Sequence, residues 1–178
     1  MGVTRRELII ATASLPLAAQ PQHGHSDAPP DVLLKTYQPR FFAAEDFQAL
    51  EAFCEILIPT DDTPGAREAR CAHYIDFLVN ASADDVQQQW RSAMKALREG
   101  GFHAADRTAR AALIEAMSKP ERDRAATHPL YSAYRLIKQQ NTFAFYTSRA
   151  GLIEALDYRG NSYNLQFPAC THPEHHKV

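Results

Sequence analysis

The sequence has little glycine, little cysteine and no excess of positive charge. Its 178 residues include seven glycines and three cysteines, and the formal net charge is −2 at pH 7. A slightly acidic chain does not suit a nucleic-acid surface, so we expect no nucleic-acid partner. No convincing run of alternating polar and apolar residues occurs, and we therefore expect no β-strand.

The motifs that commonly carry cofactor chemistry are also missing. There is no glycine-rich nucleotide loop, Walker sequence, Gly-x-Ser-x-Gly elbow or His-Glu-x-x-His motif. The cysteines match neither a Cys-x-x-Cys-His haem site nor an iron–sulfur spacing. We therefore assign no catalytic, cofactor-binding or metal-binding residue.

Residues 1–19 have the pattern of a twin-arginine export signal. Arg5 and Arg6 precede a short apolar segment that ends near small residues, which predicts export of the folded protein to the periplasm. The segment is too short to span a bilayer comfortably, so we expect membrane association only through this signal or through partners. The alternative is a chance arginine pair before a core helix. Neither 16–18 nor 17–19 has small residues at both ends, so cleavage of the signal stays open.

The remainder divides into a linker, a helical domain and a tail. Residues 20–39 are rich in proline and polar residues and predict a linker or extended arm. Apolar residues recur at helical spacing through 40–157, which predicts an all-α domain of five or six helices. Trp90 lies on one apolar stripe and is expected in the core. The stripes are Phe47, Leu50, Cys54 and Leu57; Ala69, Ala72, Ile75 and Val79; Val86, Trp90, Ala93, Met94 and Leu97; Ala109, Ala112, Leu113, Ala116 and Met117; Leu130, Tyr134, Ile137 and Phe145; and Leu152, Ile153 and Leu156.

A short acidic turn lies between the first two of these helices. Pro59 is expected to end the first helix, because proline lacks the amide donor and disfavours helical geometry in the preceding residue. Thr63 and Pro64 suit the N-cap and first position of the second helix. Asp61 and Asp62 lie in the turn and have two interpretations: they contact a partner or a ligand, or they cap the second helix and favour its dipole. Pro120 is expected to follow the end of the fourth helix.

Cysteine pairing has three alternatives in a chain expected outside the cytoplasm. Cys54 and Cys71 lie at similar distances on either side of the acidic turn, so antiparallel helices would bring them together as a disulfide. Cys170 would then be free or bonded to a partner, and the other two pairings stay open. The end of the chain, Cys170 to His176, is also rich in metal-ligand types. A structural zinc site would need a further ligand pair elsewhere, for which His73, His103 and His128 are candidates. A polar terminus without metal is the alternative.

Residues 158–178 are predicted to form an irregular tail. Tyr158, Tyr163 and Phe167 lack helical spacing, and glycine and asparagine between them favour tight turns. Aromatic side chains on an irregular arm are suited to anchoring a partner protein, and we assign these three residues, with Asp61 and Asp62, to partner binding. The alternative is that the rings cover the domain's own core.

Several segments, in this order, resemble the gluconate 2-dehydrogenase subunit 3 family. They are Phe41-Phe42, Ile58 to Asp62, Pro64 to Ala66, Tyr74-Ile75-Asp76, Phe145 to Leu152, Tyr158 to Tyr163 and Phe167 to His175. Ala43 departs from the family, which often has a hydroxyl residue as a cap before the first helix.

The resemblance implies a non-catalytic small subunit of a periplasmic flavin-dependent sugar or sugar-acid dehydrogenase. In such a complex the large partner is a flavoprotein that carries FAD and the catalytic base, and a cytochrome c often accepts the electrons. The small subunit usually carries the twin-arginine signal for both chains, and the family has no assigned catalytic residues to carry over. The competing hypothesis is a free-standing periplasmic metal-binding protein or enzyme that uses the Cys- and His-rich C-terminus.

Overall fold

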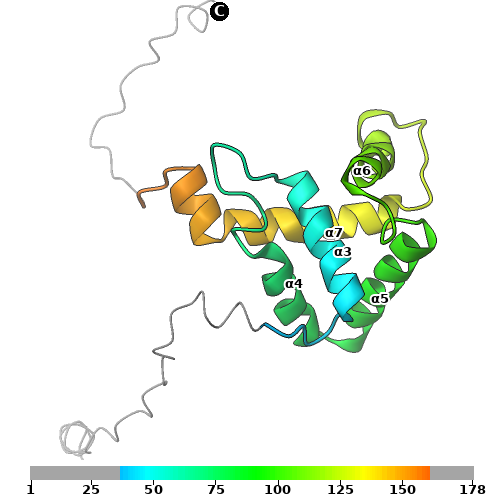
Figure 1. The fold of residues 1–178 in the computed structure, drawn as a ribbon, viewed down its shortest axis with the longest axis horizontal. Coiled ribbons are helices and arrows are strands. Elements are labelled where there is room, and N and C mark those ends of the chain that lie inside the picture. Colours follow the sequence, from blue (N-terminus) through cyan, green and yellow to red (C-terminus); the bar gives the residue numbers. More distant parts are fainter. Residues whose placement is uncertain (1–36, 161–178) are drawn as a thin grey trace, which may run out of the picture. The chain divides into compact units, whose positions relative to one another are not determined.

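The computed structural model describes residues 37–160, which form five α-helices and one π-helix (Figure 1). The elements in chain order are α3 (Ala44–Leu57), α4 (Cys71–Asn80), α5 (Asp84–Glu99), α6 (Arg107–Arg122), α7 (Tyr131–Tyr146) and the π-helix η1 (Ala150–Ala155). No strand occurs within this range, which confirms the predicted all-α class. The compact unit that holds these helices begins at Pro39. Within residues 37–160 no helix has the length and apolar character needed to cross a membrane.

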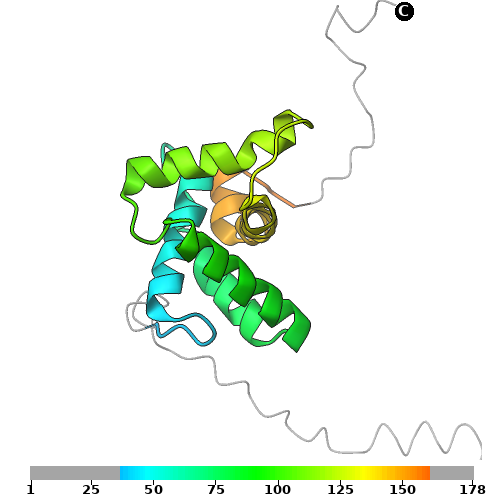
Figure 2. The same ribbon diagram turned by 90° about the vertical axis from the view of Figure 1, so that its right-hand side faces the viewer.

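Helix α7 is the centre of the domain. Figure 2 shows it nearly end-on, with α3, α5 and α6 around it, and it also contacts α4 and η1. Its buried positions recur at helical spacing, since Ala133, Tyr134, Ile137, Ala144 and Phe145 all face inward. A helix with this many buried residues is stabilised mainly by tertiary packing and less by the helix propensity of its residues.

The predicted apolar stripes supply most of the core. Trp90 is 2% exposed, as expected, and Phe42 meets its indole edge-on with ring centroids 5.7 Å apart. Phe53, which lies outside the predicted stripe of α3, is also fully buried and contacts Phe102 at 5.1 Å between ring centroids. The apolar residues predicted for the last helix behave differently, because Ile153 and Leu156 are more than half exposed.

The helix ends agree with the sequence only in part. Helix α3 ends before Pro59 as predicted, and its N-cap Ala43 makes no side-chain cap hydrogen bond. The predicted start of the second helix at Thr63 and Pro64 is wrong, because α4 begins at Cys71 after a left-handed Arg70 with φ of 58°. Pro120 does not follow α6 but lies inside its last turn. There the missing amide donor removes a single intrahelical bond, and the helix continues to Arg122.

Asn141 is a buried polar residue at the centre of the core. Its side-chain amide donates a hydrogen bond of 3.2 Å to the carbonyl oxygen of Cys54, which joins α7 to α3. That carbonyl lies at the end of α3 and also accepts the amide of Ile58. The contact therefore gives this carbonyl a second donor and links the end of α3 to α7.

Candidate functional site

The acidic turn is a closed loop between α3 and α4. The amide of Ala66 donates to the carbonyl of Ile58 at 2.8 Å and so closes the loop at its base. Glu55 on α3 braces it from below, since one carboxylate oxygen accepts the amide of Thr60 at 3.2 Å and the other accepts that of Arg67 at 3.1 Å. The loop therefore has a defined shape that does not depend on a partner.

Gly65 permits this closure. A Cβ atom at this position would lie 2.3 Å from the backbone nitrogen of Thr60, well inside van der Waals contact. Only glycine lets the two backbone segments approach so closely. The Pro64-Gly65-Ala66 sequence therefore has a structural reason within the loop.

Asp61 and Asp62 are both exposed at the outer end of this loop. One carboxylate oxygen of Asp61 accepts the Thr63 amide at 2.9 Å and the Thr63 hydroxyl at 3.0 Å. These bonds, the backbone amide first, lower the pKa of Asp61 below its ordinary value, so the group stays ionised at neutral pH. The loop thus presents negative charge to the solvent in a fixed backbone geometry.

The structure excludes one of the two interpretations of this turn. Neither aspartate caps α4, because that helix begins at Cys71 and its N-cap, Arg70, has no side-chain cap hydrogen bond. Thr63 donates its hydroxyl to Asp61 instead of capping a helix. The capping signal in the sequence belongs to the loop itself, and contact with a partner remains a prediction.

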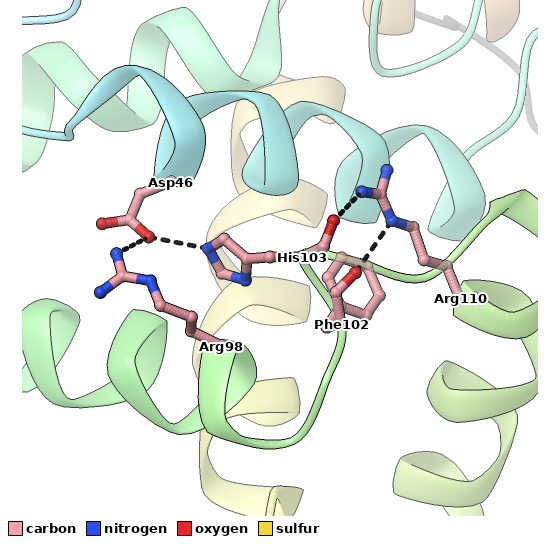
Figure 3. A network of polar contacts seen from close by, with 5 residues as sticks. All are labelled: Asp46, Arg98, Phe102, His103 and Arg110. Atoms are coloured by element: carbon pink, nitrogen blue, oxygen red, sulfur yellow. Dashed lines mark hydrogen bonds and ion pairs between the residues drawn. The ribbon is translucent and has the colours of Figure 1, made fainter.

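A second polar cluster joins the start of α3 to the segment between α5 and α6 (Figure 3). One oxygen of Asp46 lies 2.6 Å from a guanidinium nitrogen of Arg98 and 2.8 Å from Nε2 of His103. Arg110 donates to the backbone carbonyls of Phe102 and His103 at 3.0 and 2.7 Å. Of these residues, only His103 had a role in the sequence analysis, as a candidate ligand of a zinc site. Asp46 is more than fifty positions away from Arg98 and from His103 in the chain.

The geometry of the Asp46–His103 pair suits a structural role. An aspartate that orients a histidine is familiar from general-base catalysis, in which the other ring nitrogen reaches the substrate. Here Nδ1 of His103 is buried and has no hydrogen-bond partner. The ring can therefore tie the 99–106 segment to α3, but in this arrangement it offers no nitrogen to a substrate.

The surface beside this cluster is shallow. A hollow of about 300 Å³ is lined by Glu45, Gln48, Ala49, His103, Ala104 and Arg110. A neighbouring hollow of about 180 Å³ is lined by Ala52, Glu55, Ile56, Arg67, Arg107 and Arg110. Between residues 37 and 160 no group of three or more His, Cys, Asp or Glu side chains is arranged to hold a metal ion.

Asp76 fastens the beginning of the domain to α4. Its carboxylate is fully buried and accepts three backbone amides, from Arg40 at 2.8 Å, Phe41 at 3.0 Å and Phe42 at 3.0 Å. The guanidinium of Arg91 covers the Phe41 ring at 5.0 Å. Two segments that carry the family resemblance, Phe41-Phe42 and Tyr74-Ile75-Asp76, therefore meet in space. We call this contact the Asp76 clamp.

The clamp was missed by sequence reasoning, although a signal was present. Asp76 is the only charged residue of α4 and stands between Ile75 and Phe77. A buried carboxylate must be paired or hydrogen-bonded, so an aspartate between core positions indicates a set of donors elsewhere in the chain. The sequence does not show that these donors are the amides of residues 40–42.

Cys54 and Cys71 are both buried, and the structure holds them as free thiols. The predicted disulfide is therefore not part of this structure and stays a prediction for the oxidised protein. Burial raises the pKa of Cys71 to about 12. The pKa of Cys54 is raised well above its ordinary value, mainly by burial and secondly by the nearby Cys71.

The other assigned residues are only partly within the described range. Tyr158 is 48% exposed, and its amide donates to the carbonyl of Leu152 at 2.9 Å. Arg5, Arg6, Tyr163, Phe167 and Cys170 lie outside the described residues. The structure thus places Asp61, Asp62 and Tyr158 on the surface, where their predicted role requires them to be.

Comparison with protein-family models gives one match. The model described as gluconate 2-dehydrogenase subunit 3 matches residues 44–163, from the first residue of α3 to beyond η1. No curated protein and no solved structure matches the chain.

Proposed function

The chain belongs to the gluconate 2-dehydrogenase subunit 3 family, and from this premise we propose that it is a non-catalytic small subunit of a periplasmic dehydrogenase. The family implies a complex of several subunits. In the proposed complex the large subunit carries FAD and oxidises a sugar, glycoside or sugar acid, and a cytochrome c is the proposed electron acceptor. The observation that carries the proposal is a family match that spans all the helices of the domain.

The geometry supports a binding role for the acidic loop. The loop is closed by backbone hydrogen bonds, braced by Glu55 and exposed at Asp61 and Asp62. A preformed loop loses little conformational entropy on binding, so more of its interaction energy is available for affinity. Exposed carboxylates at an interface favour a partner surface of positive potential.

A matched pair of double variants tests the loop. Asp61→Asn with Asp62→Asn keeps the side-chain shape and the turn but removes both charges. Asp84→Asn with Asp85→Asn makes the same change at another exposed pair, at the start of α5. We expect the first variant to bind the flavoprotein subunit more weakly, mainly through slower association at low salt, and the second to bind as wild type does. Equal binding by the two variants would remove the loop from the interface.

We further propose that the chain supports maturation of the flavoprotein and escorts it through the twin-arginine route. The support is the Arg5-Arg6 pair before a short apolar segment. Replacing both arginines by lysine should leave this chain and the flavoprotein together in the cytoplasm. Arg124→Lys, at an exposed position in the domain, is the control and should be exported normally. Normal periplasmic dehydrogenase activity in the double-lysine strain would rule out the escort role.

A further inference from the structure

Four aromatic side chains on α4 and α7 lie on the surface of the domain. Tyr74 and Phe77 on α4 are 38% and 55% exposed, and Phe143 and Tyr146 on α7 are 52% and 45% exposed. The rings of Tyr74 and Phe143 meet across the two helices, with centroids 6.3 Å apart. Phe77 and Tyr146 each lie three residues further along, on the same face of their helix. We call these four residues the aromatic face.

Few charged residues lie beside the aromatic face, and the nearest along the chain are Arg70 before α4 and Arg149 after α7. The stretch of α7 and its end from Gln139 to Ser148 contains no charged residue. The one charged residue of α4, Asp76, is fully buried in the clamp. Burial lowers the pKa of His73 on the same helix, so this ring is neutral at pH 7.

Other surfaces of the domain carry more charge, including the first half of α7 with Arg135 and Lys138. The exposed positions of α5 include two acids in its first turn and, further along, Arg91, Lys95, Arg98 and Glu99. An ordinary solvated helix face has this mixed character. Interface cores, in contrast, are depleted of charged residues and enriched in tyrosine and phenylalanine. The aromatic face has the composition of an interface core.

Its size agrees with this interpretation. With about 200 Å² for a whole aromatic side chain, the exposed fractions leave roughly 400 Å² of the four rings open to solvent. That area is within the usual size of the largest apolar patch on a monomer, and such patches are often functional. It would form the core of one side of a standard interface, which buries about 800 Å² per partner. The two subunits of an obligate homodimer usually bury a larger area than this standard interface.

From these observations we propose that the aromatic face of α4 and α7 is where the flavoprotein subunit docks, with an uncharged apolar surface of that subunit as its complement. The inference rests on the proposed function and extends it, since neither helix was assigned to partner contact from sequence. In this arrangement the four rings supply the apolar core of the interface, and the charged acidic loop contributes separately to association.

The test is co-purification of the flavoprotein with the tagged full-length chain. Phe77→Glu and Phe143→Glu each place a charge in the centre of the aromatic face. Val86→Glu is the matched control, because Val86 is an apolar residue on α5 that is 36% exposed. The helical circular dichroism of each variant verifies folding, and Phe77→Ser and Phe143→Ser replace any glutamate variant that does not fold.

We expect each phenylalanine variant to bind the flavoprotein about 30-fold more weakly or worse, and Val86→Glu to bind as wild type does. Wild-type binding by both phenylalanine variants would overturn the docking surface but leave the subunit role intact. If the wild-type chain itself brings down no flavoprotein, the proposed function fails first. If the wild-type chain alone is a dimer that Phe143→Glu turns into a monomer, a second copy covers the face and the inference is wrong.

Discussion

Replacing Asp76 by asparagine should loosen the beginning of the domain. The carboxylate uses one oxygen for the amides of Phe41 and Phe42 and the other for the amide of Arg40. An asparagine oxygen can keep the first pair of bonds. Its NH₂ group would then face the Arg40 amide, so that two donors oppose each other in place of one hydrogen bond.

The expected cost follows from these three bonds. Losing a hydrogen bond to a charged acceptor costs about 1.5–3 kcal/mol, and the two remaining bonds become weaker because the acceptor is no longer ionised. We therefore expect Asp76→Asn to lower the free energy of unfolding by about 3 kcal/mol. For a domain of this size that corresponds to a fall in Tm of about 10 °C.

Thermal unfolding followed by circular dichroism measures this change, with Asp84→Asn as the control because Asp84 is exposed at the start of α5. Limited proteolysis supplies an independent readout, since cleavage near residues 40–42 should become faster in Asp76→Asn than in the control. A loss below about 1 kcal/mol, with unchanged cleavage, would show that the clamp does not hold the beginning of the domain.

Four further predictions concern the loop, the thiols and the tail. Gly65→Ala should destabilise the domain by about 1–3 kcal/mol, because its Cβ would meet the Thr60 nitrogen, and chemical denaturation would show no change if the loop simply adapts. In the reduced protein, stability should fall as pH rises above 9, since Cys54 and Cys71 keep their protons in the folded state while the same thiols ionise in the unfolded chain. A variant with alanine at both positions should lose this dependence, and if it keeps the full slope the thiols are not its source. Peptide mapping without reduction tests the predicted disulfide between these two cysteines. Finding both thiols free in protein isolated from the periplasm would refute it. Deleting the residues after Asp157 should leave unfolding unchanged within about 0.5 kcal/mol but remove binding of the flavoprotein. Loss of the helical signal on truncation would instead assign the tail to the core, and unchanged affinity would place the interface elsewhere.

The helices themselves were predictable because burial imposes a period on the sequence. Trp90, Leu97 and Ile137 recur on stripes that face the core, and each is buried. The ends were less predictable, because local signals have more than one use. Thr63 carries an N-cap signal, yet its hydroxyl serves the acidic loop rather than α4.

Contacts between distant segments were beyond sequence reasoning. The Asp76 clamp joins a side chain to backbone amides more than thirty residues away, and amides leave no trace in the residue type. Asn141 lies in a polar run of the sequence, residues 138–142, yet it is fully buried and bonded to the end of α3. In both cases a polar residue in a helix marks a tertiary contact whose partner only the fold reveals.

We propose above all that this chain is a subunit of a flavin-dependent dehydrogenase. The most direct measurement is to purify the tagged full-length chain from the periplasm of its native host and to assay the material for flavin and for sugar- or sugar-acid-dependent reduction of an electron acceptor. We expect a flavoprotein to co-purify in a fixed ratio and to carry all of the flavin and the activity. A chain that is recovered alone, without flavin or activity, while the dehydrogenase remains active elsewhere in the periplasm, would contradict it.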